Sequence, residues 1–314
     1  MKSKDKHTAS NAPRLDVYTR VTERIIADLE QGIRPWMKPW SADNAAARIT
    51  RPLRHNGTPY RGVNILLLWG ESLAKGFSGN IWMTFKQAQE LNAHVRKGEH
   101  GSLVVYADRM TKTETNDKGE DIERQIPFMK GYTVFNTEQI EGLPEHYYVK
   151  PEPKGEPLQL IEKAETFFAK TGAYIKHGGD RAYYAQALDL IQLPPPEAFK
   201  DAESYAATKA HELTHWTKHP TRLDRDFGRQ KWGDEGYARE ELVAELGAAF
   251  LAADLGIALE PREDHAAYIG HWLKVLKDDK RFIISAAAHA QRALDYLHNL
   301  QGMENEEEDQ KEAA

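Results

Sequence analysis

The chain has 314 residues, of which 40% are hydrophobic and 29% charged. That composition is typical of a globular protein, and the length leaves room for two domains with separate cores. Apolar runs such as residues 65–69 are far shorter than the ~20 residues that span a bilayer, and the basic N-terminus lacks the apolar stretch of a secretory signal. A membrane-spanning or signal-bearing protein is therefore excluded at this stage.

Cysteine is absent from the chain. Its absence excludes disulfide scaffolds, thiolate metal sites and cysteine nucleophiles, and it favours a reducing compartment. We therefore expect a cytoplasmic protein without a membrane partner, favour a monomer, and expect any metal site to consist of histidine and carboxylate ligands.

Charge is distributed unevenly along the chain. Residues 1–150 contain 22 Lys and Arg against 18 Asp and Glu, a net charge of +4, whereas residues 151–314 have a net charge of -10. Such a difference between two halves predicts two domains with different partners, a basic one and an acidic one.

The first half has the pattern of a mixed α+β domain over residues 16–149, after a polar and disordered segment 1–15. Helical spacing of apolar residues predicts helices over 16–31 and 62–75. A short strand at 82–85 leads into a helix, for which Thr84 and Gln87 have the spacing of a capping box. Alternating patterns predict strands over 102–108 and 127–136, joined by a long polar hairpin tip.

The second half is predicted to be mainly helical. Three prolines within residues 150–157 indicate a linker, and residues 301–314 are acidic enough to be a disordered tail. Between them, the patterns predict short strands at 174–176, 182–184 and 188–193, and helices over 158–171, 201–219, 235–255, 264–277 and 280–300.

The strongest chemical signal is an HExxH motif formed by His211, Glu212 and His215. On a helix, histidines four residues apart lie on one face, so both imidazoles can reach one tetrahedral ion. Glu212 beside them can act as a base towards a water on that ion, because zinc lowers the pKa of its water towards ~7. The motif predicts one zinc ion per chain, with Mn²⁺ or Co²⁺ also acceptable to such ligands.

A catalytic zinc site needs a third protein ligand, and the predicted helix over 235–255 offers Glu240, Glu241 and Glu245. Glu241 and Glu245 share one helix face. Their spacing resembles the E-x-x-x-D element of gluzincin peptidases, which implies that Glu241 binds the metal and that Glu245 braces a ligand histidine from outside. The reverse assignment stays open.

A basic and aromatic segment between residues 34 and 61 predicts a surface for single-stranded DNA. Such surfaces combine cations for the phosphates with aromatic faces on which bases stack. The candidate residues are Arg34, Trp36, Lys38, Trp40, Arg48, Arg51, Arg54, Tyr60 and Arg61. The alternative is that the tryptophans pack a core and that the arginines are ordinary solvated surface.

Several longer stretches make the chain similar to the ArdC-type antirestriction proteins of conjugative plasmids. They include GIRPWMKPW, RGVNILLLW, WMTFKQAQELNAHVRKGEHG, GYTVFNTEQIEGLP, HELTHWTKHPTRLDR and AREELVAELGAAFLAADLGI. The resemblance covers most of residues 16–300. It implies a single-stranded-DNA-binding domain over 16–149 and a zincin-like metallopeptidase domain over 158–300, in an overall α+β architecture.

The function implied by this resemblance is protection of incoming plasmid DNA from host restriction during conjugation. A host protein would be the substrate of the peptidase. Two alternatives stay open: a protein that shields DNA by occupying it while its zincin-like domain is not proteolytic, and a plain metallopeptidase with no role on DNA.

Overall fold

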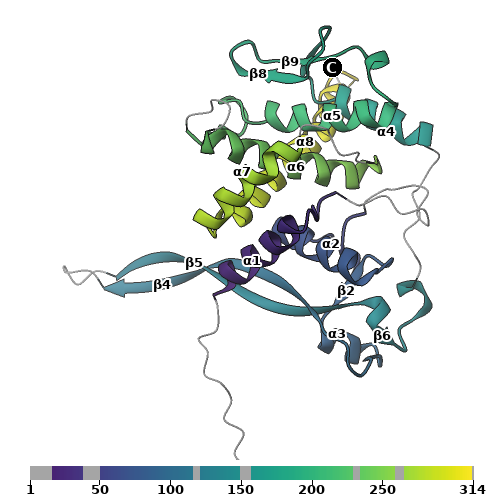
Figure 1. Cartoon of the computed structure of the whole chain (residues 1–314), viewed down its shortest axis with the longest axis vertical. Coiled ribbons are helices and arrows are strands. Elements are labelled where there is room, and N and C mark those ends of the chain that lie inside the picture. The colour runs from purple at the N-terminus through teal and green to yellow at the C-terminus, as the bar shows by residue number, and fades with distance from the viewer. Residues whose placement is uncertain are drawn as a thin grey trace, which may run out of the picture.

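The computed structural model describes residues 16–37, 50–115, 121–148, 157–228, 234–258 and 265–312. The expected disordered segment 1–15 and the linker up to residue 156 lie outside this part of the chain. So do three residues predicted to bind DNA, namely Lys38, Trp40 and Arg48. The described residues form an α+β protein, as the sequence predicts, and Figure 1 shows its helices gathered around the longer C-terminal helices.

Two helices cover the N-terminal sheet. Helix α1 (Val17–Glu30) begins after Asp16, whose carboxylate accepts a hydrogen bond from the Thr19 backbone N–H at 3.0 Å, and helix α2 (Val63–Lys75) ends at Gly76 with a left-handed φ of +71°. The short helix α3 (Phe85–Glu90) begins with the predicted capping box of Thr84 and Gln87. All three helices confirm the local patterns.

The N-terminal sheet has the strand order β1-β2-β5-β4. Its strands β4 (Ser102–Thr115) and β5 (Asp121–Asn136) pair antiparallel over most of their length, and they extend away from the body as a long arm (Figure 1). This arm is longer than predicted, because residues assigned to a polar tip, such as Thr111 and Thr113, are β-branched and continue the strand. The short strands are β1 (Leu53–Arg54), β2 (Ile81–Met83), β3 (His94–Val95) and β6 (Ile140–Glu141).

The C-terminal part consists of five helices and a small sheet. The sheet has the order β7-β9-β8, with parallel β7 and β9, and it lies against helix α5 (Figure 1). Its strands are β7 (Tyr174–His177), β8 (Tyr183–Ala185) and β9 (Leu190–Leu193). The helices are α4 (Pro157–Ala169), α5 (Ala202–Trp216), α6 (Glu235–Leu255), α7 (His265–Asp278) and α8 (Phe282–Glu312).

Helix α8 corrects one expectation. Its residues 301–312 continue the helix through most of the stretch that was predicted to be a disordered tail. This stretch is rich in Glu, Gln and Lys, which are good helix formers, and it extends an existing helix without a new nucleation cost. No helix within the described part of the chain has the length and apolar character needed to cross a membrane.

The largest hydrophobic core joins the two halves of the chain. It contains Ile25 and Trp36 from the N-terminal half together with Phe250 and Trp272 from the C-terminal half, all fully buried. The Trp36 and Trp272 rings meet edge to face at 5.9 Å. The two predicted domains therefore pack against each other through a continuous apolar core.

Candidate metal centre

Helices α5 and α6 position the candidate metal ligands. Helix α5 begins after Asp201, whose carboxylate accepts a hydrogen bond from the Ser204 backbone N–H at 2.7 Å, and helix α6 ends at the left-handed Gly256. The facing stretches of both helices are buried and rich in alanine, so their backbones can approach closely. The HExxH motif thus faces the Glu240–Glu245 segment.

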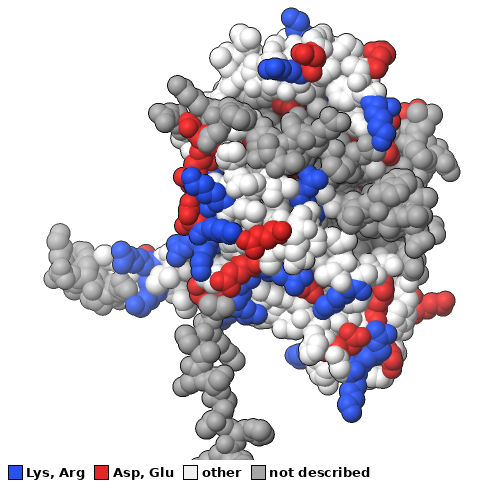
Figure 2. Space-filling view, in the orientation of Figure 1, with Lys and Arg blue, Asp and Glu red and all other residues white. Residues whose placement is uncertain are grey.

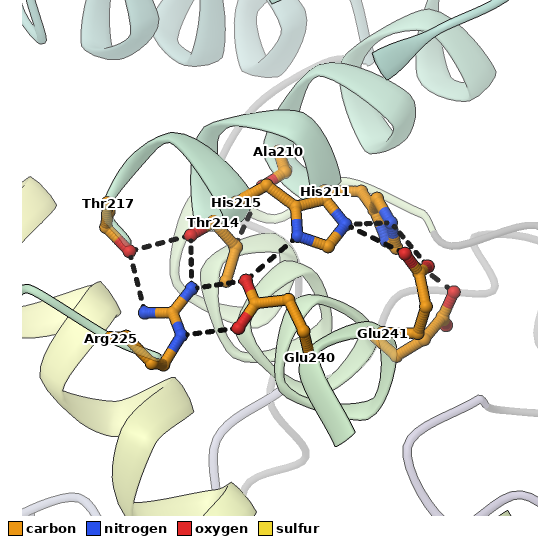
Figure 3. Close-up of polar contacts among 9 residues, drawn as sticks. Ala210, His211, Thr214, His215, Thr217, Arg225, Glu240 and Glu241 are labelled. Atoms are coloured by element: carbon orange, nitrogen blue, oxygen red, sulfur yellow. Dashed lines mark hydrogen bonds and ion pairs between the residues drawn. The ribbon is translucent and has the colours of Figure 1, made fainter. Parts of the chain in front are cut away.

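The side chains of His211, His215 and Glu241 converge (Figure 3). The two histidine Nε2 atoms are 3.2 Å apart, and the Glu241 carboxylate oxygens lie 3.6 Å from His211 Nε2 and 3.4 Å from His215 Nε2. One ligand atom from each residue lies within 4.8 Å of the other two. Two imidazoles and one carboxylate are the donor set of a catalytic zinc site with an open fourth position.

A second set of contacts holds His215 from behind. Its Nδ1 lies 3.0 Å from Glu240 Oε1, and Arg225 donates two hydrogen bonds of 2.8 Å to the two oxygens of the Glu240 carboxylate (Figure 3). Arg225 also donates to the carbonyl of Thr214 at 2.9 Å and to the hydroxyl of Thr217 at 3.1 Å. These contacts from Arg225 through Glu240 to His215 fix the orientation of the His215 ring, so that its Nε2 atom points to the ligand cluster.

Burial and charge oppose each other in this cluster. Burial disfavours protonation of His215, but Glu241 and Glu240 outweigh it and raise the pKa of His215 to about 9. Burial also works against ionisation of Glu240, but its hydrogen bonds from Arg225 and His215 hold its pKa at about 2. A histidine must be neutral to bind a metal, so metal binding here should release protons.

Glu212 has a buried carboxylate oxygen, Oε2, with no hydrogen-bond partner among the described residues. The residue is 3% exposed and directly follows the ligand candidate His211. A buried unpaired oxygen is costly, and it is tolerated where an ion or an ordered water completes the site. This oxygen and the histidine–carboxylate donor set both fit a divalent metal centre.

Two further features concern the packing of helix α6 on α5. Glu245 Oε1 lies 3.6 Å from His211 Nδ1, the ring nitrogen that does not face Glu241. Gly247 lies so close to Thr214 that a Cβ atom on it would be 2.4 Å from Thr214 Cγ2 and 2.7 Å from Thr214 Oγ1. The glycine therefore sets how closely the two helices approach at the HExxH motif.

The structure thus brings together the three predicted ligands, with Glu245 against one of them. Metal binding and base function of these residues stay predictions. Sequence reasoning missed Arg225 altogether and considered Glu240 only as a weaker candidate ligand. Glu240 directly precedes Glu241 and could have been singled out as a carboxylate on a buried helix, but nothing in the sequence pairs it with Arg225.

The segment predicted to bind DNA is placed differently from the prediction. Trp36 is fully buried, and Tyr60 is buried with the guanidinium of Arg54 over its ring at 5.4 Å. Because both side chains are buried, we no longer assign stacking to them. The tryptophan packs the core, which is the alternative left open by the sequence.

Two of the predicted DNA-binding arginines bind acidic residues of the C-terminal helices instead. Arg51 is buried and lies 3.3 Å from Asp254, and Arg61 is ion-paired with Asp295. The acidic half of the chain supplies partners for basic residues of the N-terminal half, and so these two arginines join the halves. Arg34 and Arg54 are partly or fully exposed and stay candidates for contact with phosphates.

Comparisons with families of known proteins match both halves. Residues 15–135 match the N-terminal domain of anti-restriction factor ArdC, and residues 162–289 match the zincin-like metallopeptidase family. The chain is also similar to an uncharacterised protein, y4eC, of Sinorhizobium fredii, with 42% identity over 90% of this chain and 92% of that protein.

Two further relatives have described functions. The chain is 40% identical to DNA primase TraC of Escherichia coli over 89% of its own length, but it spans only 27% of that primase. Among solved structures, the chain is similar to the metal-free antirestriction protein ArdC from plasmid R388, with 44% identity and a TM-score of 0.75. The aligned region covers 91% of this chain and 98% of that protein. The Mn(II)-bound structure of the same protein has 43% identity and a TM-score of 0.74 over 92% of this chain and 99% of itself.

Proposed function

Because the chain belongs to the ArdC antirestriction family, we propose that it binds single-stranded DNA and carries a working zinc peptidase site, and that together these protect incoming plasmid DNA from host restriction. The proposal extends to a cytoplasmic location, which suits a chain without cysteine. The relatives of this chain include an antirestriction protein from a plasmid and a DNA primase, and both names point to work on DNA.

The peptidase part of the proposal is carried by the unpaired Glu212 carboxylate oxygen beside the ligand cluster. A structural metal site needs no base, whereas a hydrolytic site needs one within reach of the attacking water. His211, His215 and Glu241 would hold the metal, which when bound lowers the pKa of water to ≈ 7 and polarises a carbonyl.

Each protein residue then has a defined part. Glu212 accepts a proton from the attacking water and passes it to the nitrogen of the departing amine, so that the peptide bond is exchanged for a new acid and a new amine. Glu240 and Arg225 keep His215 in one orientation. Glu245 lies against His211 from the side opposite to Glu241.

Zinc is our choice of metal, because two histidines and one carboxylate around an open position are typical of zinc hydrolases. A relative binds Mn(II) in its crystal structure, and this donor set also accepts Mn²⁺ and Co²⁺. Elemental analysis of the protein purified without added metal tests the choice. His211→Ala should lose most of the bound metal while its circular dichroism spectrum is unchanged; full metal occupancy in this variant would contradict the ligand assignment.

Restriction of transferred DNA in cells tests the function. Cells that express the wild-type chain should protect incoming DNA, and Glu212→Gln should keep the metal but lose protection, since an amide cannot accept the proton. Protection by Glu212→Gln at the wild-type level would favour the alternative in which the protein acts by occupying DNA. Hydrolysis without any DNA binding would favour a plain peptidase.

A further inference from the structure

The arm formed by β4 and β5 has two faces, and the strand register defines them. Residues directly opposite in an antiparallel pair point to the same side of the ribbon. Tyr106 is opposite Lys130, and Met110 is opposite Ile126, so these side chains share one face. We call this the aromatic face; its residues with a described side chain are Tyr106, Asp108, Met110, Lys112, Ile122, Arg124, Ile126, Phe128, Lys130 and Tyr132.

At the root of the arm the strands are covered, but further out they are not. Val104 is buried in a small cluster with Trp82, and Val105 is buried in the main core. Tyr132, directly opposite Val104, is 46% exposed, and further out Tyr106 is 48% and Met110 54% exposed. The aromatic face therefore leaves the body with large apolar side chains in solvent, and Figure 1 shows no other described element over the outer part of the arm.

The exposed rings of Tyr106 and Tyr132 form a continuous row with the half-buried ring of Phe128. The Tyr106 ring centroid lies 6.2 Å from that of Phe128 and 6.4 Å from that of Tyr132. The Lys130 ammonium lies 5.2 Å from the Phe128 centroid. Large apolar side chains that stay in contact with water are unfavourable, so exposed apolar patches of this kind mark sites that a binding partner covers.

Charge on this face identifies the partner. Three cations belong to this face: Lys130 lies between Phe128 and Tyr132 along β5, and Lys112 and Arg124 are opposite each other further out. Of the acids in the same register, Asp108 accepts a hydrogen bond from the Tyr106 hydroxyl, and Glu114 is opposite Ile122. Lysine and arginine side chains gather along the arm up to its undescribed tip (Figure 2). Aromatic rings with cations between them are the composition of surfaces that hold single-stranded nucleic acid by stacking and phosphate contacts.

We propose that the aromatic face of the β4–β5 arm is the surface on which this protein stacks the bases of single-stranded DNA. The inference rests on the proposed DNA binding and moves its main surface from the 34–61 segment to the arm. The observation that favours the arm is the exposure of the Tyr106 and Tyr132 rings, whereas Trp36 and Tyr60 of the 34–61 segment are buried. Stacking contacts the flat face of a base, which all bases have, and not the hydrogen-bonding edges that distinguish them. Binding to this ribbon should therefore show weak sequence preference.

The opposite face of the same arm provides a matched control. It carries Arg109, Thr111 and Gln125, of which Gln125 donates a hydrogen bond to the Thr111 hydroxyl at 2.8 Å. All three are exposed and none is aromatic. Arg109→Gln removes one positive charge from the arm without touching the aromatic face, as Lys130→Gln does on the aromatic face.

The test measures binding of the full chain to a fluorescein-labelled oligothymidine of ~30 nucleotides by fluorescence anisotropy, long enough for several stacked bases. Phe128→Leu should weaken binding about 5-fold or more, and a triple variant that also carries Tyr106→Leu and Tyr132→Leu should weaken it at least 100-fold. Leucine keeps the apolar character of the strand, and circular dichroism verifies the fold. Lys130→Gln should lower the slope of log affinity against log salt by about 0.7, and Arg109→Gln should leave it unchanged.

The outcomes separate this inference from the proposed function. If the wild-type chain binds no single-stranded DNA, the proposed DNA binding is refuted and this surface with it. If the wild-type chain binds and the triple variant binds equally well, the surface is refuted while DNA binding stands. If the triple variant loses self-association in sedimentation and keeps DNA affinity, the face belongs to a second copy of the chain and the inference is overturned.

Discussion

A substitution at Gly247 tests whether the packing of α6 on α5 determines the metal site. In Gly247→Ala the added Cβ would lie 2.4 Å from Thr214 Cγ2 and 2.7 Å from its Oγ1. Ordinary contact needs about 3.5–4.0 Å, so the helices must separate by on the order of 1 Å or Thr214 must rotate. Rotation would break the hydrogen bond from Thr214 Oγ1 to the Ala210 carbonyl, and Thr214 is 1% exposed, so its neighbours resist either change.

Two opposing energies set the expected size of the effect. Overpacking a buried contact costs about 1–3 kcal/mol, and replacing glycine by alanine inside a helix returns about 1 kcal/mol. We therefore expect the free energy of unfolding of Gly247→Ala, measured by urea titration, to be about 0–2 kcal/mol lower than that of the wild type. Zinc affinity, measured by competition with a chromogenic chelator, should fall as well, because a shift on the order of 1 Å exceeds the ~0.2 Å tolerance of metal–ligand distances.

Two companion variants make the result decisive. Gly270→Ala lies in helix α7, where an added Cβ meets no atom within 4 Å, so it should be neutral or stabilising and leave zinc affinity unchanged. Thr214→Ala combined with Gly247→Ala removes the two shortest contacts, those to Cγ2 and Oγ1, and leaves the one to Cβ at 3.2 Å. The double variant should therefore be more stable than the sum of the two single effects predicts. If Gly247→Ala is as stable as Gly270→Ala and binds zinc as wild type does, the close approach has no consequence and the reasoning is refuted.

The remaining predictions concern the buried and half-buried ion pairs. Arg225→Met leaves the buried Glu240 carboxylate without its arginine partner and should lower the free energy of unfolding in urea by about 3–5 kcal/mol. The double variant Arg225→Met, Glu240→Leu should recover most of this stability. A loss of less than about 1 kcal/mol in the single variant contradicts this account. Folding lowers the pKa of Glu240 from 4.5 to about 2, so the Glu240 carboxylate is protonated at a higher pH in the unfolded chain than in the folded one. The ionised Glu240 therefore stabilises the fold fully above about pH 4.5, and this contribution should be lost as the pH falls towards 2. The metal-free Glu240→Gln variant should lack this part of the pH dependence of the free energy of unfolding. Arg51→Gln should lower the melting temperature, because it removes the arginine partner of Asp254 and leaves that carboxylate with His298 alone among the ion-pair partners described here. The same variant should change affinity for single-stranded DNA less than about 2-fold; a large loss of DNA affinity at unchanged stability would return Arg51 to the DNA surface.

Local patterns in the sequence were sufficient for most elements of the fold. The helix α6 was predicted with its observed bounds, and the capping box at Thr84 and Gln87 was predicted from spacing alone. These features depend on neighbours within one or two turns of the chain, where propensity and capping act directly. The bounds of the β4–β5 arm were less predictable. The length of a strand depends on its partner strand, and threonines such as Thr111 and Thr113 lie in a polar stretch whose composition is typical of a loop.

That His211 and His215 face the same side was likewise predictable, since the fixed spacing of a helix places i and i+4 side chains on one face. Glu241, on a different helix, was expected beside them only from the resemblance to the gluzincin element, and its position 3.6 and 3.4 Å from the two Nε2 atoms is a result of the tertiary structure. Composition could not show which basic and aromatic residues face solvent. Trp36 and Phe128 are both aromatic and both have basic residues near them in the sequence, but one is buried against Trp272 and the other is half-buried on a projecting ribbon.

The sequence by itself determined the helices, the HExxH ligand spacing and the charge difference between the halves, because each depends on residues close together in the chain. Only the tertiary structure decided that Arg225 and Glu240 brace His215, that Gly247 sets the helix approach, and that Arg51 binds Asp254. Arg51 and Asp254 are 203 residues apart, and contacts over such a separation are set by how the two halves bury their apolar faces in one core, which no local pattern encodes.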